Sequence, residues 1–374
     1  MTDLPIPAPG APSHAHDGAM EPYLLEPAAE PATEPATEPT TGATTVAPSS
    51  PRSRVPARPV RGGATAWIAA VSALLPLVSG CRANPPGDPS AATPTGVHAS
   101  GRPGHRPTPT VRTPTPPAPA RAWPGPDDTG VPPGVRLRPS TSFTVTRDGM
   151  VVDGLEVTGS ITVEADNVTI RNTRVRGVSD YWGILQRKGH TGLTVEDSEV
   201  FGNGRRRTQF GILNQGVMIT VRRVEIHTIS KGVSTDQGLV EDSYLHDPKY
   251  YSGDHTDMIM SNGPAVEGTE LIIRHNTIVN TLDQTGAVSL FQDFGVVRNV
   301  TVQDNLLAGG GWTLYAGAGG KGASSNVKIV DNVFSRRVWR NGGSAGPVAY
   351  WDAHGRGNVW RGNTWEDGGT VTPG

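Results

Sequence analysis

The chain has almost no cysteine, because Cys81 is the single one among 374 residues, and an intramolecular disulfide is therefore excluded. Aromatic residues make up only 6% of the sequence, and the charges nearly cancel at a formal net charge of −2. This balance offers no general electrostatic attraction for nucleic acid, so we expect no nucleic-acid partner. No segment shows the apolar spacing of an amphipathic helix, which points away from helical folds.

Proline is scarce in one part of the chain and abundant in the other. Of the 34 prolines, only Pro248, Pro264, Pro347 and Pro373 lie beyond residue 140. The proline-rich part, with runs such as EPATEPATEP, cannot bury enough apolar surface to offset the entropy of the chain. We therefore expect a disordered extension over residues 1–62 and one folded domain over residues 136–374.

One apolar run, ATAWIAAVSALLPLVSG at residues 64–80, follows four arginines and precedes Cys81. A basic stretch, a short apolar stretch and a small-residue site are typical of a secretory signal. VSGC resembles the bacterial lipobox, so we expect a signal peptide over 63–81, lipidation at Cys81 and a location outside the cytoplasm, on the cell surface or secreted. A plain membrane anchor with an incidental cysteine is the alternative. Residues 82–135 would then be a proline- and threonine-rich linker.

The signal begins late in the chain. No methionine lies between Met20 and Met150, whereas Val55 or Val60 could be encoded by an alternative start codon. Either start would give a signal peptide of ordinary length. We therefore expect the residues before Val55 to lie outside the natural product.

The folded part carries an internal repeat, of which ELIIRHNTI at 270–278 and NVTVQDNLL at 299–307 are examples. Alignment of eight such segments gives a mostly small, polar position at Thr173, Ser198, Val224, Ser243, Asn276, Asn305, Asn332 and Asn363. Period-two alternation predicts strands, and a spacing of about 27 residues is typical of stacked coils. The sequence therefore predicts an all-β, single-stranded right-handed parallel β-helix with a structural ladder of asparagines.

A second strand pattern, of which DMIM at 257–260 is one example, lies between the segments of the first. Its alignment puts Asp257 at the position of Gly232 in the preceding coil. It also predicts that Met258 and Met260 point inward and fill the core.

Most titratable groups gather in one stretch, HDPKYYSGDHTDMIM at 246–260. Its loop lengthens one coil, and insertions in solenoids often carry ligand sites. Clustered carboxylates also need a cation, a partner or a ligand to balance their charge. The candidate catalytic residues are His255, Asp257, Asp254 and Lys249. The candidate substrate-binding residues are His246, Tyr250, Tyr251, Lys231 and Arg274, with a turn-capping role as the alternative for His246. Calcium prefers oxygen ligands, and the candidate ligands are Asp254, Asp257 and Asp236.

Together, the repeat and this loop resemble the pectate-lyase-like right-handed β-helix proteins over about residues 140–374. They are most similar to secreted actinobacterial β-helix proteins with an SYxHD strand, a loop and an H-x-D-G-I-Q strand. The matching residues are Ser243, Tyr244, His246, Asp247, His255 and Asp257, whereas Met258 and Met260 replace Gly and Gln. The resemblance implies a polysaccharide ligand, but a fold alone does not fix the chemistry.

Two functions remain open from the sequence. The first is an enzyme that acts on an acidic polysaccharide by β-elimination or epimerisation, with a glycoside hydrolase using Asp254 and Asp257 as a variant. The second is a non-catalytic carbohydrate-binding or cell-wall module whose outward aromatic rings stack on sugars. The cluster of titratable groups favours the enzyme, whereas Met258 and Met260 in place of Gly and Gln favour the binding module. In both cases we expect a monomer.

Overall fold

The structure is a computed structural model that describes residues 122–177 and 180–373. These residues form 26 strands and no α-helix, and so none of them belongs to a helix that could cross a bilayer. The predicted extension, signal peptide and Cys81 lie outside the described residues. Residues 122–135, which the sequence assigned to the linker, are described, and Gly130 N–H donates a hydrogen bond to Arg223 O at 3.1 Å.

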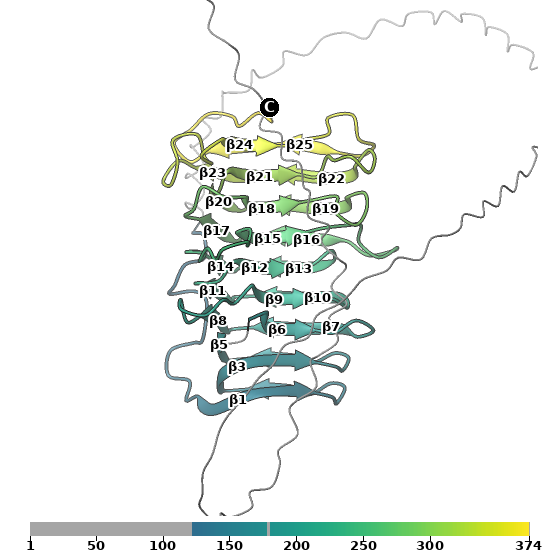
Figure 1. Cartoon of the computed structure of the whole chain (residues 1–374). Coiled ribbons are helices and arrows are strands. Elements are labelled where there is room, and N and C mark those ends of the chain that lie inside the picture. The colour runs from purple at the N-terminus through teal and green to yellow at the C-terminus, as the bar shows by residue number, and fades with distance from the viewer. Residues whose placement is uncertain (1–121, 178–179, 374) are drawn as a thin grey trace, which may run out of the picture. The chain divides into compact units, whose positions relative to one another are not determined.

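The strands stack in three columns along one axis, from β1 at one end to β24 and β25 at the other (Figure 1). Each coil runs from the first column through the second to the third, and every pair of neighbouring strands within a column is parallel, as in β5 with β8, β6 with β9 and β4 with β7. The predicted parallel β-helix is thereby confirmed.

The first two columns are joined in the earliest coils, where β1 (Arg138–Val145) and β3 (Leu155–Val163) run through both. The first column continues with β5 (Arg174–Gly177), β8 (Glu199–Gly202), β11 (Glu225–His227), β14 (Tyr244–Leu245), β17 (Thr277–Asn280), β20 (Leu306–Gly309), β23 (Val333–Ser335) and β26 (Thr364–Trp365). The second column continues with β6 (Trp182–Gln186), β9 (Phe210–Asn214), β12 (Lys231–Ser234), β15 (Asp257–Ser261), β18 (Gly286–Leu290), β21 (Trp312–Ala316) and β24 (Gly346–Ala349).

The third column forms a separate sheet. It contains β2 (Val151–Asp153), β4 (Thr169–Arg171), β7 (Thr191–Glu196), β10 (Val217–Arg222), β13 (Gly238–Glu241), β16 (Leu271–Arg274), β19 (Arg298–Gln303), β22 (Ser325–Val330) and β25 (Val359–Arg361).

The core consists of apolar rows that run from coil to coil, because equivalent residues of parallel strands stack on one another. In the first column one such row is Val157, Val175, Val200, Ile226, Leu245, Ile278, Leu307 and Phe334, and every member is fully buried. The partly buried Trp360 and Trp365 pack against this core in the last coil. One continuous apolar core thus supports all three columns.

A ladder of buried side chains fills the corner between the third and first columns. The Asn276 N–H donates to Asn305 Oδ1 at 3.0 Å, and the Asn305 N–H donates to Asn332 Oδ1 at 3.0 Å. The Ser243 and Asn332 N–H groups bond in the same way to the next asparagine. The residue before each ladder position has a left-handed backbone, which asparagine, aspartate and glycine tolerate best: Asn172, Asp197, Arg223, Asp242, His275, Asp304, Asp331 and Gly362. The predicted structural role of the asparagines is confirmed.

The predicted register of the second column is wrong by one residue. Asp257 pairs with Lys231 rather than with Gly232, and Met260 pairs with Ser234. Strict alternation fails because Met258 and Ile259 are consecutive and both belong to the apolar core. Met258 fills the core as predicted, whereas Met260 is buried outside the core cluster.

Candidate functional site

The outer face of the second column gathers polar side chains from successive coils. Lys231 in β12 pairs in register with Asp257 in β15. Ser289 in β18 pairs with Tyr315 in β21, two and three coils beyond Lys231. Coils in register lie about 4.8 Å apart. We refer to Lys231, Asp257, Ser289 and Tyr315 as the column-two cluster.

Asp257 is the most unusual member of the column-two cluster. Its side chain is 1% exposed, and neither carboxylate oxygen has a hydrogen-bond partner in the structure. The Ser289 hydroxyl lies beside it, but outside normal hydrogen-bond geometry, and is also without a partner. Burial raises the pKa of Asp257, and the nearby Lys231 charge opposes this rise only in part. The Asp257 carboxyl therefore holds its proton more tightly than an exposed aspartate does, and its protonated form can donate a hydrogen bond.

Lys231 brings a buried positive charge to the same face. It is 2% exposed, and its Nζ lies 5.4 Å from the centroid of the Phe210 ring in the preceding coil. This is within the range of a cation–π interaction. Among the described residues Lys231 forms no ion pair, and its neighbours on this face are the Phe210 ring and Asp257.

Tyr315 completes the column-two cluster. Burial, the negative charge of Asp257 and the neighbouring Tyr350 together raise the pKa of Tyr315 to about 12. Its hydroxyl therefore stays protonated across the physiological range. The Tyr315 ring lies 5.1 Å from Phe291 and 5.8 Å from Tyr350, measured between centroids.

Gly286 explains how Asp257 reaches groups more than one coil away. It pairs in register with Asp257 but places no side chain between Asp257 and the next coils. A Cβ atom at Gly286 would lie 2.9 Å from Ser289 Oγ and 3.2 Å from the Tyr315 ring. Ser289 and Tyr315 therefore fill the place that a side chain at this position would take, and they lie close to Asp257.

Asp254, predicted as a catalytic residue and metal ligand, is occupied by a structural interaction. Arg207 Nε donates to its Oδ1 at 2.9 Å, and Arg207 Nη2 donates to the same oxygen at 2.5 Å. The Ser230 hydroxyl donates to the second oxygen at 2.5 Å. Asp254 is 3% exposed and ties two loops together, and Arg207, the last of the three consecutive arginines at 205–207, thus forms an ion pair with a buried carboxylate.

The other predicted site residues near Asp257 lie in the segment that precedes β15. His255 is exposed and lies close enough to Asp257 to influence that carboxyl. Lys249 is exposed, with its backbone N–H bonded to Ile229 O at 2.8 Å. Tyr250 is half exposed, whereas the buried Tyr251 hydroxyl has no hydrogen-bond partner.

His246 directly follows β14 in the first column and is not part of the column-two cluster. Its Nε2 is 3.1 Å from Glu225 Oε1 and its Nδ1 is 2.9 Å from Asp247 Oδ2. The ring also stacks on Tyr244 and on His227, at centroid distances of 4.0 and 5.2 Å. Burial disfavours the charged imidazole, but the two carboxylates outweigh it and raise the pKa of His246.

Arg274 and Asp236 are not part of the column-two cluster. Arg274 lies in the third column, where its guanidinium binds Glu241 at 2.6 Å. Asp236 accepts hydrogen bonds from the Asn262 and Gly263 N–H groups at 2.9 and 3.1 Å, which is a turn-capping role. Among the described residues no three His, Cys, Asp or Glu side chains are grouped to hold a metal ion. The calcium site stays a prediction.

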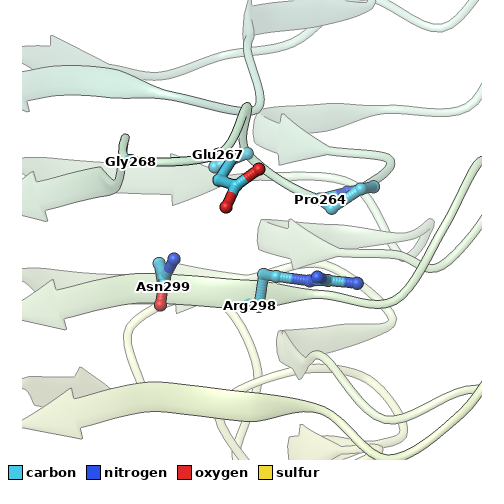
Figure 2. A pocket seen from close by; sticks show the side chains of 6 residues that line it. Pro264, Glu267, Gly268, Arg298 and Asn299 are labelled. Atoms are coloured by element: carbon cyan, nitrogen blue, oxygen red, sulfur yellow. The ribbon is translucent and has the colours of Figure 1, made fainter.

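A surface hollow lies elsewhere, between the loop after β15 and the start of β19. Figure 2 shows Pro264, Glu267 and Gly268 on one side and Arg298 and Asn299 on the other. None of the predicted site residues lines this hollow. It therefore offers no alternative location for the predicted chemistry.

Sequence reasoning missed Ser289, Tyr315 and Phe210 as neighbours of Asp257 and Lys231. Each lies in a strand that the second pattern had located, so the signal was present in the alignment of that pattern. It was hidden because a shift of one residue exchanges the inner and outer faces of a strand.

Comparison with known proteins gives this chain no relative. No protein-family model matches it, and neither the curated proteins nor the solved structures contain a significant match. Its function must therefore be argued from the chemistry of the site.

Proposed function

We propose that the protein binds an acidic polysaccharide on the outer face of the second column and cleaves it by β-elimination. The observation that carries the proposal is the pair of Lys231 and Asp257, which are buried, adjacent in register and without an ion-pair partner among the described residues. Structural ion pairs in this protein look different, because Asp254 and Glu241 are each bound by arginine. An uncompensated pair of this kind is typical of a ligand site.

The pair suits the carboxylate of a uronate sugar. A protonated Asp257 would donate a hydrogen bond to that carboxylate, and the charged Lys231 would stabilise the negative charge that grows when the neighbouring C5 proton is removed. Because both side chains are buried, the proposal requires the groups that cover them to move when the sugar binds.

The remaining steps need a base and an acid. His255, which is exposed at the start of β15, is the base that takes the C5 proton. The bond between C4 and the leaving oxygen then breaks, a C4–C5 double bond forms, and the Tyr315 hydroxyl gives its proton to the leaving oxygen. The raised pKa of Tyr315 keeps that proton available at neutral pH.

The hydrolase variant has less support. Its second carboxylate, Asp254, has both oxygens bound by Arg207 and Ser230, and so it is not available to activate water or attack a sugar. The binding module keeps one specific observation in its favour, since the exposed Tyr181 ring comes directly before β6, and the exposed Tyr250 ring lies in the loop that leads to β15.

The test is an assay of the full chain with polygalacturonate, alginate and hyaluronan, with calcium or with a chelator. The unsaturated product of β-elimination is followed by its ultraviolet absorbance. We expect product with at least one polymer, and a loss of roughly a hundredfold or more in Asp257→Asn and Lys231→Gln. Asp283→Asn, an exposed carboxylate before β18, is the matched control and should keep wild-type activity.

Two outcomes would contradict the proposal. New reducing ends without ultraviolet absorbance would show hydrolysis instead of elimination. Retention of the protein on an immobilised polymer, with neither signal, would identify a carbohydrate-binding module.

A further inference from the structure

We infer that Tyr350 and Tyr315 form an aromatic platform that binds the polysaccharide beyond the reacting sugar. The inference rests on the proposed function, because it extends the same face along the axis. Tyr350 follows β24, three coils beyond Asp257, and its ring stacks on Tyr315 at a centroid distance of 5.8 Å and an interplanar angle of 20°.

Tyr350 is exposed to an extent that core packing does not explain. Its relative exposure is 59%, the highest among the exposed large hydrophobic residues. A tyrosine that presents its ring face to solvent offers an apolar surface with a polar edge, which suits the flat faces of sugar rings.

The backbone holds this ring in an unusual conformation. Tyr350 has φ = 57°, in the left-handed region that bulky residues rarely adopt. The conformation is fixed by a hydrogen bond from Ala318 N–H to Tyr350 O at 2.7 Å. Strain of this kind persists where the surrounding structure imposes it, often at ligand sites.

The platform is continuous with the column-two cluster. Tyr315 pairs in register with Ser289, and its hydroxyl lies in the field of Asp257. Three coil spacings of about 4.8 Å separate the level of Asp257 from that of Tyr350. A sugar chain laid along the axis would therefore react near Asp257 and rest several rings away on Tyr350.

The experiment measures binding and catalysis separately in the full chain. Retardation in gels that contain polygalacturonate, alginate or hyaluronan reports binding, and ultraviolet absorbance reports product. We expect Tyr350→Ala to weaken retardation and raise KM roughly tenfold with little change in kcat, and Tyr350→Phe to behave as wild type, since it keeps the ring. Met218→Ala, an exposed apolar residue on the third column, should change neither quantity.

The possible failures can be told apart. Unchanged retardation and KM in Tyr350→Ala, with product still formed, would overturn the platform and leave the proposed function standing. Weaker retardation in Tyr350→Ala without product in any variant would support the platform and overturn the elimination chemistry. If the wild type elutes from size-exclusion chromatography as a dimer and Tyr350→Ala as a monomer, the Tyr350 ring packs against a second copy of the chain and the inference is wrong.

Discussion

Arg207 and Asp254 lie 47 residues apart in the sequence and form a bidentate ion pair between the loops that precede β9 and β15. The Asp254 side chain is fully buried, whereas Arg207 is partly exposed. The pair spans two coils and fixes the loop that leads into Asp257.

Removing this tie should destabilise the protein. Arg207→Ala leaves a buried carboxylate with only the Ser230 hydroxyl as a partner, and we expect a loss of about 2–3 kcal/mol in the free energy of unfolding. Urea unfolding followed by circular dichroism measures it. Arg205→Ala removes an exposed arginine from the same run and should stay within about 0.5 kcal/mol of wild type. Equal midpoints for the two variants would show that the ion pair contributes nothing.

The asparagine ladder gives a second stability prediction. Asn305→Ala removes the acceptor of the Asn276 N–H and the donor to Ile273 O, leaving both groups buried. We expect a loss of about 2–3 kcal/mol. Asn305→Ser should lose less, because Ser243 performs the acceptor role for the Val224 N–H at 3.1 Å. Thermal unfolding of the pair of variants checks this order, and a serine variant no better than the alanine variant would contradict it.

At neutral pH, the buried Asp257 carboxyl should lower the free energy of unfolding of the protein. Since burial raises its pKa in the folded state, the folded form holds the proton more tightly than the unfolded form. The resulting stability is fully present below the ordinary value of 3.8 and is lost as the pH rises through the folded pKa. Asp257→Asn should therefore be more stable than wild type at neutral pH, with a difference that shrinks on acidification. Urea midpoints of Asp257→Asn and wild type, measured from pH 3.8 to neutral pH, test this prediction, with Asp283→Asn as the control. A difference in midpoint that does not change with pH would contradict the raised pKa of Asp257.

His246 gives a pH dependence of stability with the same sign as that of Asp257, but its pKa is raised by neighbouring carboxylates and not by burial. Despite its burial, Glu225 and Asp247 hold the pKa of its imidazole above the ordinary value of 6.5. The protonated ring stabilises the fold below 6.5, and this contribution is lost as the pH rises through the folded pKa. His246→Gln should flatten the fall in stability at and just above 6.5. His354→Gln, at an exposed turn, should keep the wild-type slope. Thermal midpoints of both variants, measured from below to above pH 6.5, test this prediction. The same slope in His246→Gln as in the wild type would contradict it.

The sequence predicted the fold because its strongest signals are local. Alternating strands recur in every coil, a polar residue such as Asn305 recurs at all but one of the aligned third-to-first corners, and stacking follows from repetition. The outer face was harder to predict. Consecutive inward residues, Met258 and Ile259, shift the register by one, and only the correct register brings Lys231 beside Asp257.

Part of the candidate site depends on partners that no local pattern reveals. Asp254 resembles a reactive carboxylate until Arg207 is brought to it from two coils away. Tyr315 resembles an ordinary strand residue until the coils place it in the field of Asp257. Both relationships are long-range in the chain and short-range in space.

The missing side chain at Gly286 gives the outer face its continuity. Because this position has no Cβ atom, the Ser289 hydroxyl and the Tyr315 ring pack close to its backbone, next to Asp257. A single methyl group at that point would lie 2.9 Å from Ser289 Oγ and 3.2 Å from the Tyr315 ring, so these side chains would have to shift. The contact between the charged and the aromatic halves of this face is therefore controlled by a residue that has no side chain of its own.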